Sequence, residues 1–426
     1  MTLRHLKAPG PAPSTRDVSE TVRTLLARIE AGGEAAALAV AAELDGASGP
    51  VTVTPDEIAT AKAALDEDTK AAIAFAHANI RRFAEAQRGT LSEMEIEILP
   101  GVRAGQKVIP VAAAGCYVPG GRFSHIASAL MTITTARAAG VEHVAAVSPP
   151  RPLHGTAGGG RLAPDMLFAM DLAGADTILT LGGVQGVAAM AFGLFGLPPA
   201  DIIVGPGNAF VAEAKRQLFG RVGIDMVAGP TDSMILADAG ADAMTVAADL
   251  VGQMEHGADS PVWLVTTHAP LAEAVMAAVP GLVAALPKAN AASARAAWEI
   301  ASVILADSCE VMAEIADRTA PEHLHVQAAD LDWWLSRLTA YGSLFLGAET
   351  TVAFGDKAAG PNHVLPTSGA ARYTGGLSVH KFLKTVTWQR ASAEGVRPIA
   401  EATAAISRRE GMEAHARTAD IRLSRR

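Results

Sequence analysis

The sequence predicts an α/β protein with two Rossmann-like parallel-sheet domains, a helical N-terminal segment and a small helical C-terminal extension. Half of the 426 residues are hydrophobic and only 4% are aromatic. Such a composition suits helices that pack closely against parallel strands. Short apolar runs alternate with helical stretches in two series, one before and one after about residue 235. This alternation predicts βαβ units, and the two series predict two parallel sheets.

The composition also excludes several classes of partner. The net charge of −9 argues against nucleic acid, which requires a basic surface. Two cysteines in a chain of this length exclude a disulfide framework and indicate a reducing compartment. The N-terminus lacks the apolar core of a signal peptide. Residues 178–200 carry no charge, but their glycines and Pro198 favour a strand, a turn and a buried helix over a membrane span. We therefore expect a soluble, cytoplasmic protein.

The expected elements begin with helices, because residues 15–31 and 55–87 place apolar side chains at helical spacing. Short apolar or β-branched runs bounded by turn residues then predict eight strands: Val108–Ala113, His143–Ser148, Thr177–Leu181, Asp201–Val204, Ser233–Ala237, Val262–Thr266, Val303–Ala306 and Ser343–Leu346. The charged tail from residue 389 to residue 426 has a helical pattern. It lies beyond the last of these strands.

These elements suggest three domains. Residues 1–116 together with 234–375 are expected to form the first Rossmann-like domain, with the candidate metal and acid/base residues. Residues 117–233 are expected to form the second, which carries the candidate nucleotide-binding turns. Residues 376–426 would form the C-terminal extension.

Three glycine turns follow expected strands, namely residues 117–121, 182–186 and 205–208. At the carboxyl end of a parallel strand, such turns let backbone N–H groups approach an anion at a helix N-terminus. None of them has the spacing of a dinucleotide fingerprint, and no acidic ribose partner stands at the usual offset. Each alone could be an ordinary strand-to-helix turn. Three of them so close together favour a shared nucleotide cleft.

Gln253 and His256 stand three residues apart, just before Gly257. On a helix they would project from one face, and Gly257 suits a helix C-terminus, so both side chains are expected at an exposed helix end. A neutral imidazole and an amide oxygen there could be two ligands of a divalent metal ion. The alternative is a hydrogen-bonded helix end without metal.

Glu322, His323 and His325 stand at the start of a short strand. Alternation would place Glu322 on one face and the two histidines on the other. They either pair a general base with a water-activating carboxylate or form a charged strand start. Asp356, beside Lys357 in a glycine-bounded loop, suits a hard oxygen ligand as well as a turn. His363 follows in a second polar loop, and Glu410 and His415 on the tail could be solvated charges.

Together these segments resemble the histidinol dehydrogenase family over nearly the whole chain, with the motifs in family order. That family consists of zinc-dependent, NAD-linked homodimers that oxidise a primary alcohol to a carboxylate in two hydride transfers. The resemblance implies roles for residues of this sequence. Gln253, His256, Asp356 and His415 would be the zinc ligands, Glu322 the activator of water, His323 the general base, Tyr117, Gln185 and Asn208 the NAD contacts, and His363 and Glu410 substrate contacts. Because the family's tail crosses to the partner subunit, Glu410 and His415 would complete the neighbour's site.

Departures from the usual family pattern bear on the substrate. The segment Arg122–His125 replaces small neutral residues, Thr231-Asp232 replaces Ser-Glu, and Lys357 replaces Tyr. With the segment Arg372–Gly376, these features look like the sulfopropanediol 3-dehydrogenase branch, which oxidises 2,3-dihydroxypropane-1-sulfonate to sulfolactate. Added cations suit a sulfonate better than the cationic amine of histidinol.

Arg122, His125, Thr231 and Lys357 are therefore expected to contact an anionic substrate, although Arg122 could be a surface charge. Histidinol itself is the alternative substrate. A non-catalytic homologue that binds nucleotide or metal is the alternative from a different class, and it ranks last because every core position of the family is filled.

Overall fold

The computed structural model describes residues 3–11, 17–120, 124–151 and 160–424. The chain divides into two compact units: the first comprises Met1–Ala86 and Val111–Phe382, and the second comprises Gln87–Pro110 and Leu383–Arg426. Both Rossmann-like sheets belong to the first unit. The domain boundaries expected near residues 116, 233 and 375 therefore stay predictions.

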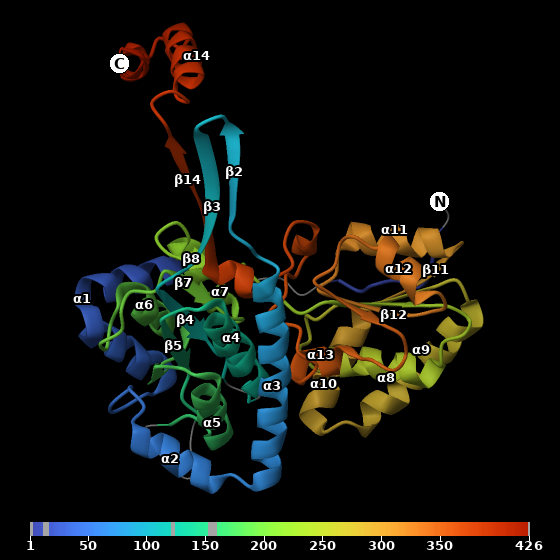
Figure 1. The fold of residues 1–426 in the computed structure, drawn as a ribbon. Coiled ribbons are helices and arrows are strands. Elements are labelled where there is room, and N and C mark those ends of the chain that lie inside the picture. Colours follow the sequence, from blue (N-terminus) through green and yellow to red (C-terminus); the bar gives the residue numbers. More distant parts are fainter. Residues whose placement is uncertain (1–2, 12–16, 121–123, 152–159, 425–426) are drawn as a thin grey trace. The chain divides into compact units, whose positions relative to one another are not determined.

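One sheet of the first unit is wholly parallel, with the strand order β6-β5-β4-β7-β8 (Figure 1). Its strands are β4 (Ala113–Tyr117), β5 (His143–Ser148), β6 (Thr177–Thr180), β7 (Ile202–Val204) and β8 (Gly223–Ile224). The helices α1 (Ser19–Asp45), α6 (Gly183–Phe192) and α7 (Ala209–Leu218) share one apolar core with it. The helices α4 (Ile126–Ala139) and α5 (Pro164–Ala173) pack against each other. All residues of β4 are buried, as expected of a central parallel strand.

The other sheet has the order β1-β11-β10-β9-β12-β13 and is parallel except for β1 at its edge. Its strands are β1 (Leu3–Lys7), β9 (Ser233–Ala237), β10 (Val262–Thr266), β11 (Ser302–Ala306), β12 (His323–Gln327) and β13 (Ser343–Leu346). The helices α8 (Ala243–Met254), α9 (Ala269–Ala285) and α10 (Lys288–Glu299) form one core with it. The helices α11 (Cys309–Thr319) and α12 (Leu331–Arg337) form a second core.

The parallel strands of both sheets follow the same order, in which the first strand lies between the second and the fourth. This is the doubly wound order of Rossmann-like folds, so the predicted fold class is confirmed. The neighbouring first and fourth strands are β4 and β7 in one sheet and β9 and β12 in the other. Between such strands the connections diverge to opposite sides, which leaves a crevice for ligands.

The N-terminal helices differ in their limits from the prediction. The expected helix over residues 15–31 is the first part of α1, which is kinked at Gly33 and continues to Asp45. Residues 55–87 form two helices, α2 (Pro55–Ala64) and α3 (Glu67–Gly89). Asp66 interrupts them because its carboxylate accepts a hydrogen bond from the backbone N–H of Thr69 at 2.7 Å and so starts a new helix. Helical spacing alone does not reveal such a cap.

Residues 178–200 form the end of β6, a turn and the buried helix α6, as predicted. Within the described ranges, no helix is long and apolar enough to cross a membrane.

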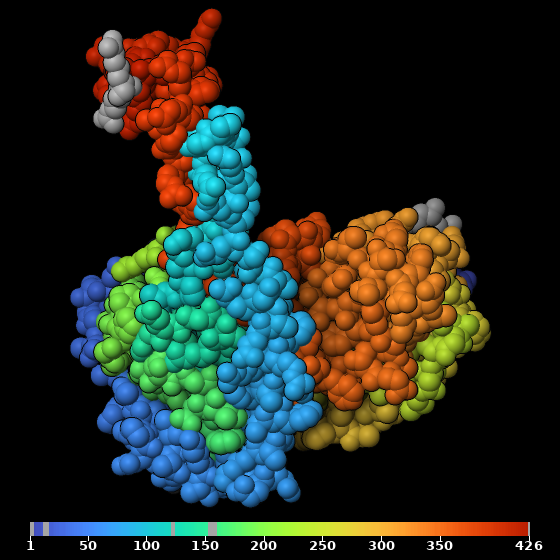
Figure 2. Space-filling view, in the orientation of Figure 1, coloured from blue at the N-terminus to red at the C-terminus, as the bar shows by residue number. Residues whose placement is uncertain are grey.

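The second unit contains an antiparallel sheet of β2 (Met94–Leu99), β3 (Val102–Pro110) and β14 (Leu383–Ala391), followed by α14 (Arg397–Arg409) and α15 (Glu413–Leu423). The two helices pack on each other through small alanine side chains. Every residue of β2 is exposed, and Figure 2 shows the hairpin of β2 and β3 uncovered on the face in view. The apolar side chains of β2 therefore meet solvent.

Two predicted elements are wrong in this region. The expected strand Val108–Ala113 is divided, because β3 ends at Pro110 and β4 begins at Ala113. Proline lacks the N–H that would continue the ladder, so the antiparallel and parallel sheets separate there. The tail is not helical from its start, since Gln389–Ala391 complete β14 in register with Val102–Ala104.

Candidate active site

The predicted catalytic residues lie at the amino edge of the six-stranded sheet. His323 begins β12, and Glu322 precedes it directly. The neighbouring strand β9 begins at Ser233, directly after Asp232. The helix α8 runs back from the carboxyl ends of the strands, so its last turn, with Gln253, returns to the same edge.

His256 and Asp356 meet at this edge. His256 Nε2 is 3.8 Å from Asp356 Oδ2, and His323 Nε2 is 3.5 Å from Asp356 Oδ1. Asp356 lies in the short helix α13 (Val352–Lys357). Three residues that are separate in the sequence are thus brought together around one carboxylate.

Gln253 is buried, with 4% of its surface exposed, whereas His256 is exposed. The expectation of an exposed helix end is therefore wrong for Gln253. The helix ends at Met254, three residues before Gly257, and the backbone N–H of His256 closes a further turn onto the Gln253 carbonyl at 3.3 Å. Within the described part of the chain, Gln253 Oε1 has no hydrogen-bond partner. A buried acceptor without a donor is costly, so this oxygen suits a ligand from outside the chain.

The described residues contain no cluster of three or more His, Cys, Asp and Glu side chains able to hold a metal ion by themselves. The ligands predicted in the first unit include only two residues of those types, His256 and Asp356. The third is the amide of Gln253. The donor set of imidazole, carboxylate and amide oxygen still fits zinc when one further ligand is supplied.

Asp232 holds the catalytic pair by its backbone and its side chain. Asp232 Oδ1 accepts from the backbone N–H of Glu322 at 2.7 Å, and Glu322 Oε2 accepts from the backbone N–H of Asp232 at 3.2 Å. The Asp232 carbonyl oxygen lies 3.3 Å from His323 Nδ1. Asp232 Oδ2 accepts from the backbone N–H of Ser368 at 2.9 Å. Because these partners bridge two parallel strands and a loop, Asp232 fixes how Glu322 and His323 enter the site.

The charges in this cluster depend on one another. Burial opposes a charge on His323, but the carboxylates of Glu322 and Asp356 outweigh it and raise the pKa of His323 to about 9. Burial raises the pKa of Glu322 to about 8, and the nearby Asp232 carboxylate contributes. For Asp356, burial is outweighed by the contact with His323 Nε2 and by the histidine charges, and its pKa falls to about 2. Asp356 is therefore an ionised carboxylate, as a metal ligand must be.

Three candidate substrate residues, His125, His363 and Lys357, interact with the cluster around Asp356 or lie next to it in the chain. Burial and the charges of His363 and Lys357 lower the pKa of His125 to about 4. Both ring nitrogens of His363 are engaged, Nδ1 with the Asp356 carbonyl oxygen at 2.7 Å and Nε2 with Ser128 Oγ at 3.0 Å. Its ring therefore connects α4 to the backbone of the predicted metal ligand. Lys357 is exposed beside Asp356.

Four further candidate site residues remain. Thr231 is partly buried and precedes Asp232. Glu410 and His415 lie in the second unit, where both are exposed on its helical part. Arg122 lies outside the described residues. The roles of all the site residues stay predictions.

The predicted cofactor residues stand at the carboxyl edge of the five-stranded sheet. Tyr117 ends β4, and its hydroxyl oxygen accepts from the backbone N–H of Gly183 at 3.0 Å. Gln185 is buried in the first turn of α6, and Asn208 caps α7 by accepting from the backbone N–H groups of Phe210 and Val211. The three residues therefore follow three different strands at one edge, as the alternation of strands and turns predicted.

At this edge the backbone turn after β7 approaches the end of β4 closely. Gly205 has a φ of 114°, and a Cβ there would lie 2.0 Å from the Tyr117 carbonyl oxygen, so only glycine lets the turn after β7 approach the end of β4. A glycine turn and helix N-termini at the carboxyl ends of the first and fourth strands are typical of dinucleotide sites in doubly wound folds.

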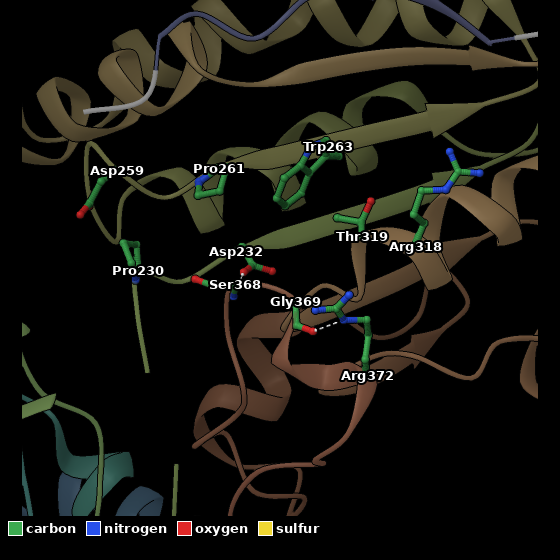
Figure 3. A pocket seen from close by; sticks show the side chains of 10 residues that line it. All are labelled: Pro230, Asp232, Asp259, Pro261, Trp263, Arg318, Thr319, Ser368, Gly369 and Arg372. Carbon is green, nitrogen blue, oxygen red and sulfur yellow. Dashed lines mark hydrogen bonds between the residues drawn. The ribbon is translucent and has the colours of Figure 1, made fainter. Parts of the chain in front are cut away.

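A cavity of about 430 Å³ opens beside Asp232. Figure 3 shows the Asp232 carboxylate and the Trp263 ring at this cavity, with the Arg372 guanidinium donating to the carbonyl oxygen of Gly369. Asp232 thus lines this cavity in addition to contacting the catalytic pair. The cavity lies at the amino edge of the same sheet.

A match to one protein-family model shows the family of this chain. The model of the histidinol dehydrogenase family matches residues 10–423. The chain belongs to the histidinol dehydrogenase family. Members of the family are oxidoreductases that act on CH–OH groups with NAD. The predicted class of enzyme is therefore confirmed, and the alternative of a non-catalytic homologue is not supported.

Relatives in the histidinol dehydrogenase family match the chain from end to end. A histidinol dehydrogenase homolog from Ruegeria pomeroyi is 65% identical, covering 100% of this chain and 98% of its own length. A sulfopropanediol 3-dehydrogenase from the same organism is 60% identical, covering 100% and 97%. The crystal structure of histidinol dehydrogenase from Elizabethkingia anophelis superposes with a TM-score of 0.91 at 32% identity, covering 98% of this chain and 94% of that one.

Two residues that the structure places at these sites, Asp232 and Asp45, belong to no functional motif in the sequence. Asp232 differs from the usual family residue, but its partner Glu322 stands 90 residues away. Asp45 lies 140 residues from Gln185, to which it is hydrogen-bonded. Pairs so distant leave no periodic signal in a single sequence.

Proposed function

We propose that this enzyme oxidises 2,3-dihydroxypropane-1-sulfonate to sulfolactate, with zinc as its metal and NAD as its oxidant. The choice of substrate is supported by the 60% identity, over the whole chain, to a sulfopropanediol 3-dehydrogenase. The histidinol dehydrogenase from Elizabethkingia anophelis is 32% identical. Lys357 supports the same substrate, because a cation beside Asp356 attracts a sulfonate and repels the amine of histidinol.

In the proposed site, Gln253, His256 and Asp356 would hold the zinc ion together with His415 of the partner subunit. The unpaired buried oxygen of Gln253 and the ionised Asp356 support this set. When bound, zinc would polarise the substrate oxygen and offset the carboxylate charge beside His323. The remaining chemistry belongs to side chains of the chain itself.

His323 would remove the proton of the alcohol. The Asp232 carbonyl oxygen can only accept, so a hydrogen bond to it fixes the proton of a neutral His323 on Nδ1. Nε2, which makes no hydrogen bond within the described ranges, is then the basic nitrogen. As the alcohol loses its proton to Nε2, its carbon transfers a hydride to NAD, and an aldehyde forms.

Glu322 would serve the second oxidation. Its carboxylate takes a proton from water as the water oxygen adds to the aldehyde, and the resulting hydrate transfers a second hydride to a second NAD. The two steps together consume one water and two NAD and release the carboxylate, two NADH and three protons. Tyr117, Gln185 and Asn208 would hold the cofactor at the carboxyl edge of the five-stranded sheet.

The test is an assay of the zinc-loaded enzyme with each alcohol, in which NADH is followed by its absorbance. We expect efficient turnover of the sulfonated diol, with two NADH formed per molecule consumed, and little turnover of histidinol. The variant His323→Ala should be inactive with both. Efficient oxidation of histidinol with no reaction of the diol would assign the enzyme to the alternative substrate.

The metal is tested with His256→Ala, which removes one proposed ligand from an exposed position. We expect the variant to keep the circular dichroism of the wild type and to purify with little zinc, measured by mass spectrometry of the metal. Full zinc content together with wild-type turnover would falsify the ligand assignment.

A further inference from the structure

Asp45, the last residue of α1, is joined to the candidate cofactor edge by a hydrogen bond. Its Oδ2 accepts from Gln185 Nε2 at 2.6 Å. Its charge also reaches the neighbouring tyrosine, because burial first and the Asp45 carboxylate second raise the pKa of Tyr117 to about 12. Asp45, Gln185 and Tyr117 therefore form one polar cluster, contributed by α1, α6 and β4.

The contact with Asp45 determines the orientation of the Gln185 amide. A carboxylate only accepts hydrogen bonds, so the NH₂ of the amide must face Asp45. The amide oxygen then lies beside Gly183, since a Cβ at Gly183 would be 3.1 Å from it. Gln185 is 1% exposed, and its Oε1 has no hydrogen-bond partner within the described ranges. This buried acceptor requires a donor from outside the chain.

Asp45 has no evident role in stabilising its own helix. The C-terminal end of a helix carries partial negative charge, so a carboxylate there is unfavourable. Glu43 lies on the same turn, but Arg28 neutralises it with two hydrogen bonds of 2.7 and 2.8 Å. Asp45 has no cationic partner of this kind in the described part of the chain, and its second oxygen accepts no hydrogen bond there. One carboxylate oxygen thus remains available to a ligand.

We infer that Asp45 accepts a hydrogen bond from the adenosine ribose of NAD and excludes the 2′-phosphate of NADP. This rests on the proposed use of NAD at the carboxyl edge of the five-stranded sheet. An acidic residue at that position selects NAD in Rossmann-like domains, because it binds the 2′-hydroxyl and repels a phosphate. In this chain the acidic residue comes from a helix that precedes the first strand of the sheet. That explains why none stands at the usual offset after the glycine turns.

The experiment compares the affinities of the zinc-loaded protein for NAD and for NADP by titration calorimetry, without substrate. The variant Asp45→Asn keeps an oxygen that can accept from Gln185 but removes the charge. We expect its Kd for NAD to rise about ten-fold and its Kd for NADP to fall, because a charge-assisted hydrogen bond and a charge repulsion are both lost. Asp45→Ser, which also lacks the charge, should shift the ratio of the two Kd values in the same direction.

Glu43→Gln is the matched control, since it removes the same charge from the same turn at a side chain that already has a partner. It should leave both Kd values within about two-fold of the wild type. Weaker binding of NAD by Asp45→Asn without any gain for NADP would overturn the inference, because Asp45 would then act only through Gln185. A wild-type protein that binds neither dinucleotide would instead overturn the proposed function, and a wild type with equal affinity for both would overturn the role of Asp45 alone.

Discussion

At the scale of single residues, Asp232 connects the catalytic pair to the rest of the sheet. In Asp232→Ala the backbone N–H groups of Glu322 and Ser368 would lose their acceptor, at about 1–3 kcal/mol for each buried group. We expect a lower free energy of unfolding in urea and a fall in turnover of at least about ten-fold. Asp259→Asn lines the same cavity without a hydrogen bond to either catalytic residue, so its turnover should match the wild type. Equal effects of the two variants would remove Asp232 from its positioning role.

Glu322 allows a second prediction at this scale. If its carboxylate activates water only for the second oxidation, Glu322→Gln should slow oxidation of the aldehyde more than oxidation of the alcohol. The two half-reactions are measured separately, by supplying either the alcohol or the aldehyde in single-turnover experiments. Equal loss in both would assign Glu322 to the first step or to the structure.

At the scale of elements, the turn after β7 depends on a buried ion pair. Lys215 and Asp225 are paired in the interior, with 3% and 0% of their side chains exposed. Asp225 Oδ2 accepts from the backbone N–H of Gly205 at 2.7 Å, and Lys215 Nζ donates to the Gly205 carbonyl oxygen at 2.8 Å. The pair therefore holds the glycine at which the turn approaches Tyr117.

We expect Lys215→Met to lower the free energy of unfolding by about 3–5 kcal/mol, because it leaves the Asp225 charge buried without a partner. NAD binding should weaken as well, since Gly205 loses one of its two anchors. The control is Arg216→Met on the same helix, where Arg216 is 55% exposed and Glu213 keeps its hydrogen bond from Gln217, so the urea midpoint should change little. Wild-type stability in Lys215→Met would show that the turn does not depend on the pair.

Sequence reasoning succeeded for elements and failed for the pairs that join them. The strands Ser233–Ala237 and Val262–Thr266 were predicted with the observed limits, because each is a continuous apolar run between turn residues. The same signal misplaced Val108–Ala113, since apolar residues continue across the point where Pro110 separates two sheets. The candidate residues of the site were predicted from family motifs. Their supports, Asp232 and Asp45, could not be, because hydrogen bonds across the fold leave no local pattern.

At the scale of the whole molecule, the exposed residues of the second unit suggest a partner. Ile406 and Ile421 are 58% and 54% exposed on its helices, and the candidate residues Glu410 and His415 are exposed as well. An exposed apolar surface of this kind favours burial against another chain. We therefore keep the prediction of a homodimer in which His415 completes the partner's site.

Mixing two inactive variants tests that arrangement. When His323→Ala and His415→Ala chains exchange subunits, each mixed dimer should hold one complete site, so activity should return to about a quarter of the wild type. His323→Ala mixed with His256→Ala is the control and should stay inactive, because both residues belong to the same half-site. No recovery in the first mixture, with exchange verified by mass spectrometry, would mean that His415 serves its own chain.

The three-stranded sheet of the second unit has a consequence for synthesis in the cell. β14 pairs with β3 along its whole length, yet the ribosome makes it about 280 residues later, a delay of roughly 15–60 s at ordinary rates of translation. Until then β3 lacks one neighbour, and β2, on the other side of β3, exposes Met94, Ile96 and Ile98. Apolar hairpins with an open edge are templates for aggregation. We therefore expect the yield of this enzyme to depend on protection of the β2–β3 hairpin from aggregation until β14 has been synthesised.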